Sequence, residues 1–449
     1  MKVEILSRKT IKPSIPTPHH LRTFNLSLLD QDILGIHYCS VVFFYPSDNT
    51  STTNATNMCS MSQKSQSLKN SLSKILLHFY PLAGQLKDAV TIDCNDQGAC
   101  FIEATSGCHL TDFLTRPDPD LLKELIPSTD PNTIRSTLAC ILLVQLTSFT
   151  CGGTAVAVCV SQKFGDASSF CTFIRSWTAI SSREYSRVVV PKLVGASFLP
   201  PLDALITSIP PPTIRNCTTK RFVFHEPQIA NLKVKVAAAM GQQQHRVRNV
   251  EIVLAVILKC AAAASQSKYG SSRSMQSALL NVVNLRKRIV PPLPGNTVGN
   301  LIWKYAVMFQ ESDVELHQLV SKMKNEFTNV CNEKVKRIKS KKGYADVGES
   351  RKKIAQLLNG KLADMNTYTC TNLCGYPFYE MDFGWGKPVW VTSPSKFQNS
   401  IVLLDSKQDG ALEAWVTLDE VEMAFFERNQ ELHAVASLNP SAFTNYSRM

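Results

Sequence analysis

The residues around position 162 combine a side-chain amide and a carboxylate where a predicted strand passes into a predicted helix. Gln162 and Asp166 lie in residues 161–167, after the apolar run 155–160. A glutamine amide donates an N–H and accepts through its carbonyl oxygen, but it does not take up a proton near neutral pH. It can therefore orient a substrate or stabilise an oxyanion. Asp166 directly precedes apolar residues at helical spacing over 170–177, so we expect it to cap that helix.

No other cluster in the sequence has the spacing of a metal or phosphate site. There are 14 cysteines, and Cys370 and Cys374 stand close together, but no second His or Cys pair completes a zinc set. Gly152 and Gly153 are too few for a dinucleotide-binding loop. Residues 382–384 read Asp-Phe-Gly as in kinases, but no HRD loop or glycine-rich phosphate loop accompanies them. We therefore expect no metal site and no bound cofactor.

Length and composition indicate a globular protein with more than one domain. The 449 residues suffice for two or more domains with cores of their own, and hydrophobic residues make up 44% of the chain. The net charge of +12 favours anionic partners, among them a phosphorylated cofactor. Part of this charge lies in a Lys/Arg run over 334–342. We interpret the run as a solvated helix face and loop, because no aromatic residues interleave it as a nucleic-acid groove requires.

Nothing in the sequence predicts a targeting or membrane segment. Residues 1–17 lack the apolar core of a signal peptide. The longest apolar stretch, 250–264, contains Glu251 and Lys259 and is too short to span a bilayer. Scattered cysteines in a long chain are typical of a reducing compartment. We expect a soluble cytoplasmic protein with no membrane and no nucleic-acid partner.

Strand and helix patterns alternate along the chain without a strict β-α-β order. Strands are expected at residues 41–45, 89–94, 99–104, 136–146, 155–160, 221–225, 401–404 and 412–417. Helices are expected at 68–79, at 167–177, at 249–264 and from Thr417, where Glu420 would complete a capping box. The turn at 95–98 predicts a hairpin between the second and third of these strands.

A proline-rich stretch over 188–213 cannot sustain a helix or a central strand. We therefore expect an N-terminal domain over 1–189, a crossover loop over 190–215 and a C-terminal domain over 216–449. A segment near 363–388 is expected to pack with the N-terminal domain. The predicted fold is α/β, with two similar-sized domains, mixed β-sheets flanked by helices, and an active-site channel at the domain interface.

Several strings spread over nearly the whole chain resemble the BAHD family of plant acyl-CoA-dependent acyltransferases, and in particular its alkaloid, vinorine-synthase-like branch. The string at 382–388, Asp-Phe-Gly-Trp-Gly-Lys-Pro, reproduces a family motif in full and is the most specific. The others are Leu-Ser-Leu-Leu-Asp-Gln at 26–31, Tyr-Pro-Leu-Ala-Gly-Gln at 80–85, Phe-Thr-Cys-Gly-Gly at 149–153 and Val-Asn-Leu-Arg-Lys-Arg at 283–288.

The resemblance implies a chloramphenicol-acetyltransferase-like fold and transfer of an acetyl or similar group from acyl-CoA to a hydroxyl or amine of an alkaloid-like acceptor. It also implies a monomer that binds no cofactor and uses acyl-CoA as co-substrate. It further implies that Asp166 is structural and pairs with Arg286. Other implied roles are structural for Asp382, Gly384, Trp385 and Gly386, substrate-binding for Thr371, Asn372 and Leu373, and CoA-binding for Arg288, Gly299 and Asn300.

Gln162 departs from the family, in which this position is a histidine that acts as general base. Such a base contributes about 10²–10⁴-fold to the rate. In the first of three alternatives, transfer persists, with an easily acylated acceptor or with His37 as a speculative substitute base, since the resemblance places its strand beside the acceptor channel. In the second, the pocket catalyses cyclisation, elimination or isomerisation of an alkaloid intermediate. In the third, the protein is a non-catalytic binder of CoA or a small molecule. We favour the first.

Overall fold

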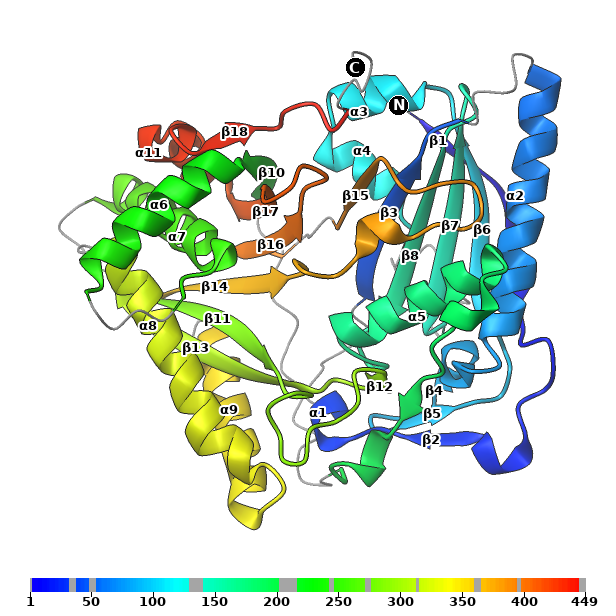
Figure 1. The fold of residues 1–449 in the computed structure, drawn as a ribbon, viewed down its shortest axis with the longest axis horizontal. Coiled ribbons are helices and arrows are strands. Elements are labelled where there is room, and N and C mark those ends of the chain that lie inside the picture. The colour runs from blue at the N-terminus through cyan, green and yellow to red at the C-terminus, as the bar shows by residue number, and fades with distance from the viewer. Residues whose placement is uncertain are drawn as a thin grey trace.

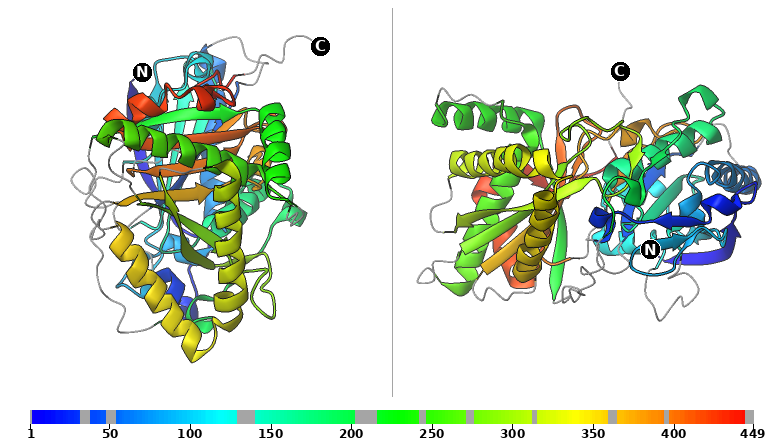
Figure 2. Two further views of the ribbon diagram at one scale, coloured as in Figure 1. Left: turned by 90° about the vertical axis from the view of Figure 1, so that its left-hand side faces the viewer. Right: turned by 90° about the horizontal axis from the view of Figure 1, so that it is seen from below.

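The chain folds around two β-sheets that stand side by side, each with helices packed against it (Figure 1). Figure 2 shows the same two halves from two further sides. The structure is a computed structural model. It describes residues 2–31, 38–47, 54–128, 140–201, 216–241, 246–270, 276–311, 315–358, 365–393 and 397–443.

A six-stranded mixed sheet forms the centre of the N-terminal half. Only β6 and β7 run parallel to each other, and the other neighbours are antiparallel. Every residue of β8 is buried. A strand covered on both faces reads as one continuous apolar run, which is why this strand could be predicted. In spatial order the strands are β1 (Val3–Ile11), β6 (Ala99–Ser106), β7 (Leu142–Phe149), β8 (Thr154–Ser161), β3 (Tyr38–Tyr45) and β15 (Trp390–Thr392).

Two long helices of this half, α2 (Asn54–Ile75) and α5 (Ala167–Ser181), pack against each other beside the sheet (Figure 1). Trp177 on α5 donates from Nε1 to Ser71 Oγ on α2 at 3.0 Å. The aromatic residues of α5 are buried in the core of this half. The smaller elements are a three-stranded sheet of β2 (Thr23–Asn25), β5 (Thr91–Asp93) and β4 (Gln85–Leu86), and the helices α1 (Leu28–Gln31), α3 (Leu110–Thr115) and α4 (Pro119–Glu124).

A seven-stranded mixed sheet forms the centre of the C-terminal half. Its strands, in spatial order, are β13 (Ile302–Gln310), β11 (Gln276–Asn284), β14 (Met365–Asn372), β16 (Ser400–Asp405), β17 (Leu412–Asp419), β10 (Cys217–Phe224) and β18 (Ala436–Leu438). The helices of this half are α6 (Glu226–Ala239), α7 (Asn249–Tyr269), α8 (Leu316–Asn329), α9 (Lys341–Leu358), α10 (Glu420–Phe426) and α11 (Gln430–His433). β14 is parallel to both of its neighbours, so the expected mixed sheet is present here as well.

α7 is the central helix of the C-terminal core. The helix has 21 residues and is longer than the expected apolar stretch 250–264, so by length and composition it is long and apolar enough to cross a membrane, contrary to the expectation from the sequence. Of its apolar window, 72% is buried inside the protein. Apolar residues all around a helix are typical of burial within a large core. In this structure α7 packs against α6, α8, α10 and α11.

The two halves are joined by strands and side chains that cross between them. β9 (Lys192–Leu193), which follows α5, pairs with β12 (Thr297–Val298) of the C-terminal half. Glu413 on β17 accepts hydrogen bonds from Arg221 Nε at 2.7 Å, Trp390 Nε1 at 3.1 Å and Trp415 Nε1 at 2.8 Å. A buried carboxylate requires several such donors. Because Trp390 lies on β15 of the first sheet, this cluster fixes one sheet against the other.

The segment expected near 363–388 to pack with the N-terminal half is divided by the structure. Residues 365–372 form β14 of the second sheet, whereas Leu373, Phe378, Met381 and Phe383 are buried in the core of the N-terminal half. The chain then adds β15 to the first sheet. Most of the expected crossover, 202–215, lies outside the described residues.

Two local predictions were wrong. β5 and β6 do not form a hairpin, because β5 pairs with β2 and β4 while β6 pairs with β1 and β7. The loop between them is held by Asp96, which accepts from the Thr17 backbone N at 2.9 Å. The helix expected from Thr417 is α10, which begins at Glu420 with the side chain of Asp419 as its cap. Thr417 itself still lies in β17.

Candidate active site

Gln162 is the first residue after β8, in the turn that leads to α5. Its side chain is half-buried, between the buried residues Ser161 and Lys163. Its backbone carbonyl accepts a hydrogen bond from Asn300 Nδ2 at 2.6 Å. The turn is therefore held through the backbone, and Gln162 as a whole residue is partly exposed. The structure thus places it at the junction that the sequence predicts.

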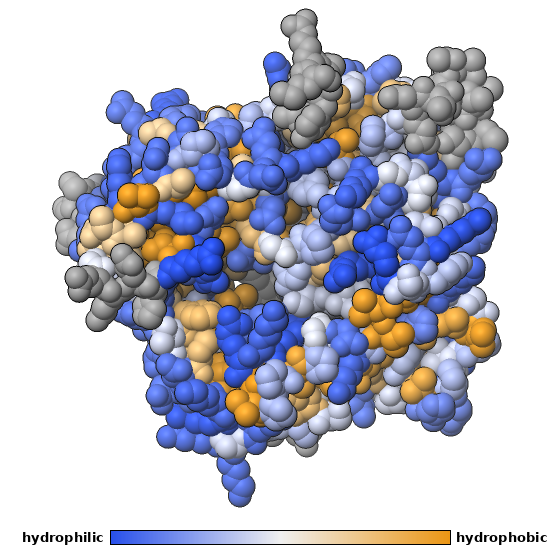
Figure 3. Space-filling view, viewed as in Figure 1, coloured by the Kyte–Doolittle hydropathy of each residue, from blue (hydrophilic) through white to orange (hydrophobic). Residues whose placement is uncertain are grey.

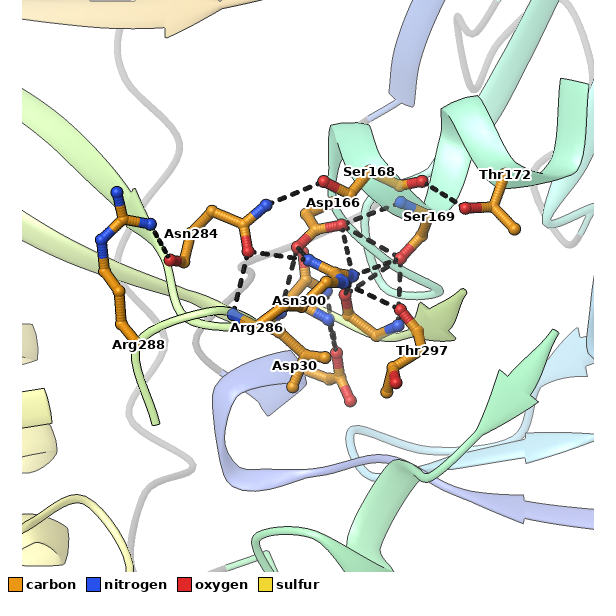
Figure 4. Close-up of polar contacts among 12 residues, drawn as sticks. Asp30, Asp166, Ser168, Ser169, Thr172, Asn284, Arg286, Arg288, Thr297 and Asn300 are labelled. Atoms are coloured by element: carbon orange, nitrogen blue, oxygen red, sulfur yellow. Dashed lines mark hydrogen bonds and ion pairs between the residues drawn. The ribbon is translucent and has the colours of Figure 1, made fainter. Parts of the chain in front are cut away.

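Asp166 directly precedes α5 and forms an ion pair with Arg286, as the resemblance implied (Figure 4). The two hydrogen bonds from the guanidinium measure 2.7 and 2.9 Å. The carboxylate also caps α5 by accepting from Ser169 N at 3.0 Å, and it accepts from Leu301 N at 3.1 Å. Both oxygens are thus occupied, and both side chains are 5% exposed or less. Such a carboxylate orients its loop and has no free lone pair with which to act as a base.

A second buried carboxylate, Asp30 on α1, fixes the same turn through Asn300. Asp30 accepts from Asn300 N at 2.8 Å and Nδ2 at 2.9 Å (Figure 4). It also accepts from Ser27 N at 2.8 Å and Oγ at 2.7 Å. Burial raises the pKa of Asp30, and these four hydrogen bonds lower it in part. Since the Asn300 amide bridges Asp30 and the Gln162 carbonyl, the three residues form one chain of contacts. The sequence analysis missed Asp30, although its string at 26–31 was one of the matching motifs.

The Asn300→Ala variant is expected to lose about 1–3 kcal/mol of unfolding free energy, because it leaves a buried carboxylate and a carbonyl with one donor fewer. Urea unfolding measures this as a lower midpoint at constant m. The matched control is Asn296→Ala, which removes a hydrogen bond to Val190 O at the surface and should change stability by about 0.5 kcal/mol. Equal losses in the two variants would contradict a special role of Asn300.

The residues assigned to the CoA side are used differently from one another. The Gly299 carbonyl accepts from Ser169 Oγ at 3.0 Å and Arg286 Nη2 at 3.2 Å, and Asn300 is only 2% exposed. Both residues therefore contribute to holding the loop. Arg288 is half-buried, donates to Asn284 O at 2.7 Å and lies 5.0 Å from the ring centre of Phe327. Of these three residues, Arg288 is the charged one, and its side chain is partly exposed.

The residues assigned to substrate binding end β14, at the junction of the two halves. Thr371 is exposed, whereas Leu373 is buried in the core of the N-terminal half. Asn372 is half-buried, and its Oδ1 accepts from Cys374 N at 2.9 Å. Thr371 and Asn372 are thus at least partly accessible to solvent, and Leu373 contributes packing.

Tyr376 extends this junction and was missed by the sequence analysis. Its hydroxyl shares a hydrogen bond of 2.8 Å with Ser168 Oγ, which also accepts from Asn284 Nδ2 at 2.9 Å. In Figure 4 the bond from Asn284 to Ser168 joins the end of β11 to the start of α5.

Figure 3 shows a hollow in the face between the second sheet and the N-terminal end of α5. The loop of Gln162 and Asp166 therefore lies where the two halves meet.

The motif at 382–388 lies at the other end of α5. Asp382 Oδ1 accepts from Gly384 N at 2.7 Å and Gly386 N at 2.9 Å, and both glycines have φ near +100°. Trp385 stacks on Phe383, whose carbonyl accepts from Ser181 at the end of α5. At 1.5 Å per residue, the 15 residues of α5 separate this motif from Asp166 by about 22 Å. Its contacts are those of a packing motif.

His37 lies outside the described residues, so the structure does not place the proposed substitute base. β3 begins at the next residue, Tyr38, whose partner across the sheet is Ser161. Tyr38 donates from its hydroxyl to Cys140 O at 2.6 Å. Among the described residues there is no group of three or more His, Cys, Asp or Glu side chains that could hold a metal ion.

Comparison with known proteins gives matches over almost the full chain. Residues 1–433 match the sequence model of the Transferase family. Akuammiline synthase 1 of Alstonia scholaris is 38% identical over 443 residues, which cover 96% of this chain and 97% of that protein. Stemmadenine O-acetyltransferase of Catharanthus roseus is 34% identical over 434 residues, with 94% and 96% covered.

Solved structures match in fold as well. The crystal structure of vinorine synthase superposes with a TM-score of 0.82 at 29% identity, covering 98% of this chain and 100% of that one. TRI101 of F. graminearum, complexed with coenzyme A and T-2 mycotoxin, matches with a TM-score of 0.69 at 15% identity, with 93% and 99% covered, and shows the fold alone. The predicted fold of two α/β domains with mixed sheets is confirmed by these matches.

Proposed function

Because this chain belongs to the Transferase family, the BAHD acyltransferases, we propose that it transfers an acyl group from acyl-CoA to a small alkaloid-like plant metabolite. The observation that carries the proposal is the loop between β8 and α5, which has its structural ion pair although Gln162 stands where the family has a histidine. Its Asp166–Arg286 pair is intact, and it lies at the hollow between the two halves. We propose acetyl-CoA as the first donor to test, since one relative is named as an O-acetyltransferase.

The proposed site lies in a channel between an N-terminal domain, residues 1–189, and a C-terminal domain, residues 216–449. Clefts between domains are usual places for small-molecule sites. Gln162 would orient the acceptor or the acyl carbonyl through its amide. Thr371 and Asn372 would border the acceptor, and Arg288 would face the anionic CoA. Coenzyme A bound in a neighbour of the same fold supports this co-substrate.

The side-chain amide of Gln162 cannot accept a proton, so its proposed role is to position the reacting groups. Orientation of the reacting groups can by itself supply several kcal/mol of the barrier. His37 remains the proposed substitute base, and a His37→Ala variant tests it. A base contributes about 10²–10⁴-fold, so a fall in kcat of that size would give His37 the role. We also propose that the enzyme is monomeric and cytoplasmic and that it binds no cofactor.

The deciding experiment incubates the pure protein with acetyl-CoA and candidate acceptors and follows the release of free thiol. We expect thiol release that depends on the acceptor, together with an acylated product detected by mass. A product formed without acyl-CoA would overturn the proposal in favour of a non-acylating enzyme. Tight binding of CoA or an alkaloid with neither outcome would overturn it in favour of a non-catalytic binder.

A further inference from the structure

We propose that the hydroxyl of Tyr376 is a catalytic hydrogen-bond donor, which binds the carbonyl oxygen of the thioester as that oxygen becomes negatively charged. This inference rests on the acyl transfer proposed above and adds a second polar group to the same site, beside Gln162. The Tyr376 hydroxyl lies 2.8 Å from Ser168 Oγ, in the first turn of α5. The hollow shown in Figure 3 lies at this end of α5, and Tyr376 is half-buried rather than enclosed in the core.

A chain of hydrogen bonds leads to this hydroxyl from a buried cation. Arg286, which is 3% exposed, donates from its backbone N to Asn284 Oδ1 at 3.0 Å and from Nη1 to the same oxygen at 3.4 Å. These two donors fix the orientation of the Asn284 amide, because its oxygen must face them. Asn284 Nδ2 then donates to Ser168 Oγ at 2.9 Å (Figure 4). Since an amide nitrogen donates and does not accept, Ser168 is the acceptor in this bond.

The last hydrogen bond of the chain runs from Ser168 to Tyr376. The Ser168 hydroxyl carries one hydrogen, and among the described residues Tyr376 Oη is the acceptor at hydrogen-bond distance from it. The hydrogen of the tyrosine hydroxyl is then available to a ligand. Burial raises the pKa of Tyr376, so the hydroxyl keeps this hydrogen at neutral pH. Hydrogen bonds in a chain polarise one another, and this chain begins at a guanidinium, so its last donor is strengthened.

The acyl-transfer reaction creates a charge that such a donor stabilises. The acceptor forms a bond to the carbonyl carbon of the thioester, and the electron pair of the C=O double bond moves to oxygen. Tyr376 donates a hydrogen bond to this oxyanion and keeps its own proton. When the carbonyl re-forms, the C–S bond breaks, CoA leaves with the electron pair, and its sulfur takes up the proton that the acceptor loses. Because the oxyanion is absent from the bound substrate, the contact raises kcat and changes KM little.

The test is the Tyr376→Phe variant, which removes the hydroxyl and keeps the ring, whose centre lies 5.6 Å from that of Phe378. Thiol release from acetyl-CoA is followed with benzyl alcohol and with benzylamine as acceptors. We expect kcat to fall by about 10²–10³-fold with both, since the same oxyanion forms with either acceptor. The KM for acetyl-CoA should change by less than about twofold.

Ser168→Ala tests the chain itself, because this serine acts through the tyrosine as a positioning residue. We expect a smaller fall in kcat than with Tyr376→Phe. The double variant should be as slow as Tyr376→Phe alone, since without the tyrosine hydroxyl the serine has nothing left to orient. Tyr379→Phe is the matched control. It removes a hydroxyl from the same short segment, whose ring packs against the N-terminal core, and kcat should stay within about twofold of the wild type.

A binding measurement reads the same contact without turnover. S-carboxymethyl-CoA carries a carboxylate close to the place where the oxyanion forms. We expect Tyr376→Phe to weaken its binding by about tenfold, as the loss of a hydrogen bond to a charged group does, and to leave the Kd of CoA unchanged. Calorimetry of both ligands with both proteins gives the four constants.

Two outcomes would overturn the inference. One is a kcat of Tyr376→Phe within about threefold of the wild type, which would mean that the hydroxyl only links Ser168 to the loop. The other is an equal loss of affinity for S-carboxymethyl-CoA and for CoA, which would mean a general structural role. If the wild type releases no thiol with any acceptor, the transferase proposal fails instead. The two Kd values then still decide whether Tyr376 donates to an anion at this position.

Discussion

Replacing Gln162 by histidine is expected to raise kcat for acyl transfer to benzyl alcohol by at least about 10²-fold, because a general base typically contributes 10²–10⁴-fold. The side chain at this position is half-buried and its backbone is held by Asn300, so an imidazole would enter a turn that is already oriented. Thiol release from acetyl-CoA, with the acylated alcohol identified by mass, measures the gain.

The gain should depend on pH in a known direction. Only the neutral imidazole accepts a proton, so the added activity should be present above a pKa of about 6.5 and should be lost as the pH falls below it. The Gln162→Asn variant is the matched control, since it keeps an amide and adds no base. If the histidine variant acylates benzyl alcohol no faster than the control at about pH 8, the pocket does not present its acceptor to this position.

Removing the guanidinium of Arg286 is expected to cost about 3–5 kcal/mol of unfolding free energy, the usual penalty for breaking a buried ion pair on one side. Arg286→Ala takes two hydrogen bonds from Asp166 and one from the Gly299 carbonyl. Because Asp166 is only 5% exposed, water does not replace these donors fully. The midpoint of urea unfolding and kcat should both fall, because the same ion pair orients the loop that carries Gln162.

The control for this prediction is an ion pair in solvent. Arg187 pairs with Glu184 with 64% and 49% of the side chains exposed, and Arg187→Ala should cost less than about 1 kcal/mol. The double variant Asp166→Ala with Arg286→Ala should cost less than the sum of the single changes, because no unpaired buried charge remains. Strict additivity would show that the two side chains do not act as a pair.

Elements whose signals are local could be predicted from the sequence. β8 is a continuous apolar run because both of its faces are covered, and α5 shows its buried face at helical spacing. Asp166 could be assigned as a cap because capping depends on the next three residues. The turn at 95–98 shows the limit of such reasoning. The loop does connect two strands, but these strands belong to different sheets, and pairing is decided by distant partners.

The same division applies to the site. From its neighbours in sequence and the family pattern, Gln162 could be recognised as the residue that replaces the family's general-base histidine. Asp30 and Asn300 could not be linked, because they are 270 residues apart and neither type signals the contact. Tyr376 joins Ser168 across 208 residues and belongs to no motif. Such pairs arise only when α1, α5 and the ends of β11 and β14 are brought to one place.

The amino-acid sequence alone thus determined the type of chemistry open to position 162, because the atoms of an amide do not change with the fold. It also determined approximately where strands and helices begin and end, because these positions depend on neighbours along the chain. The tertiary structure decided which carboxylates around that amide are already occupied, and that the motif at 382–388 lies about 22 Å away along α5. Hydrogen bonds saturate, so the availability of a lone pair is set by every group that folding brings within reach.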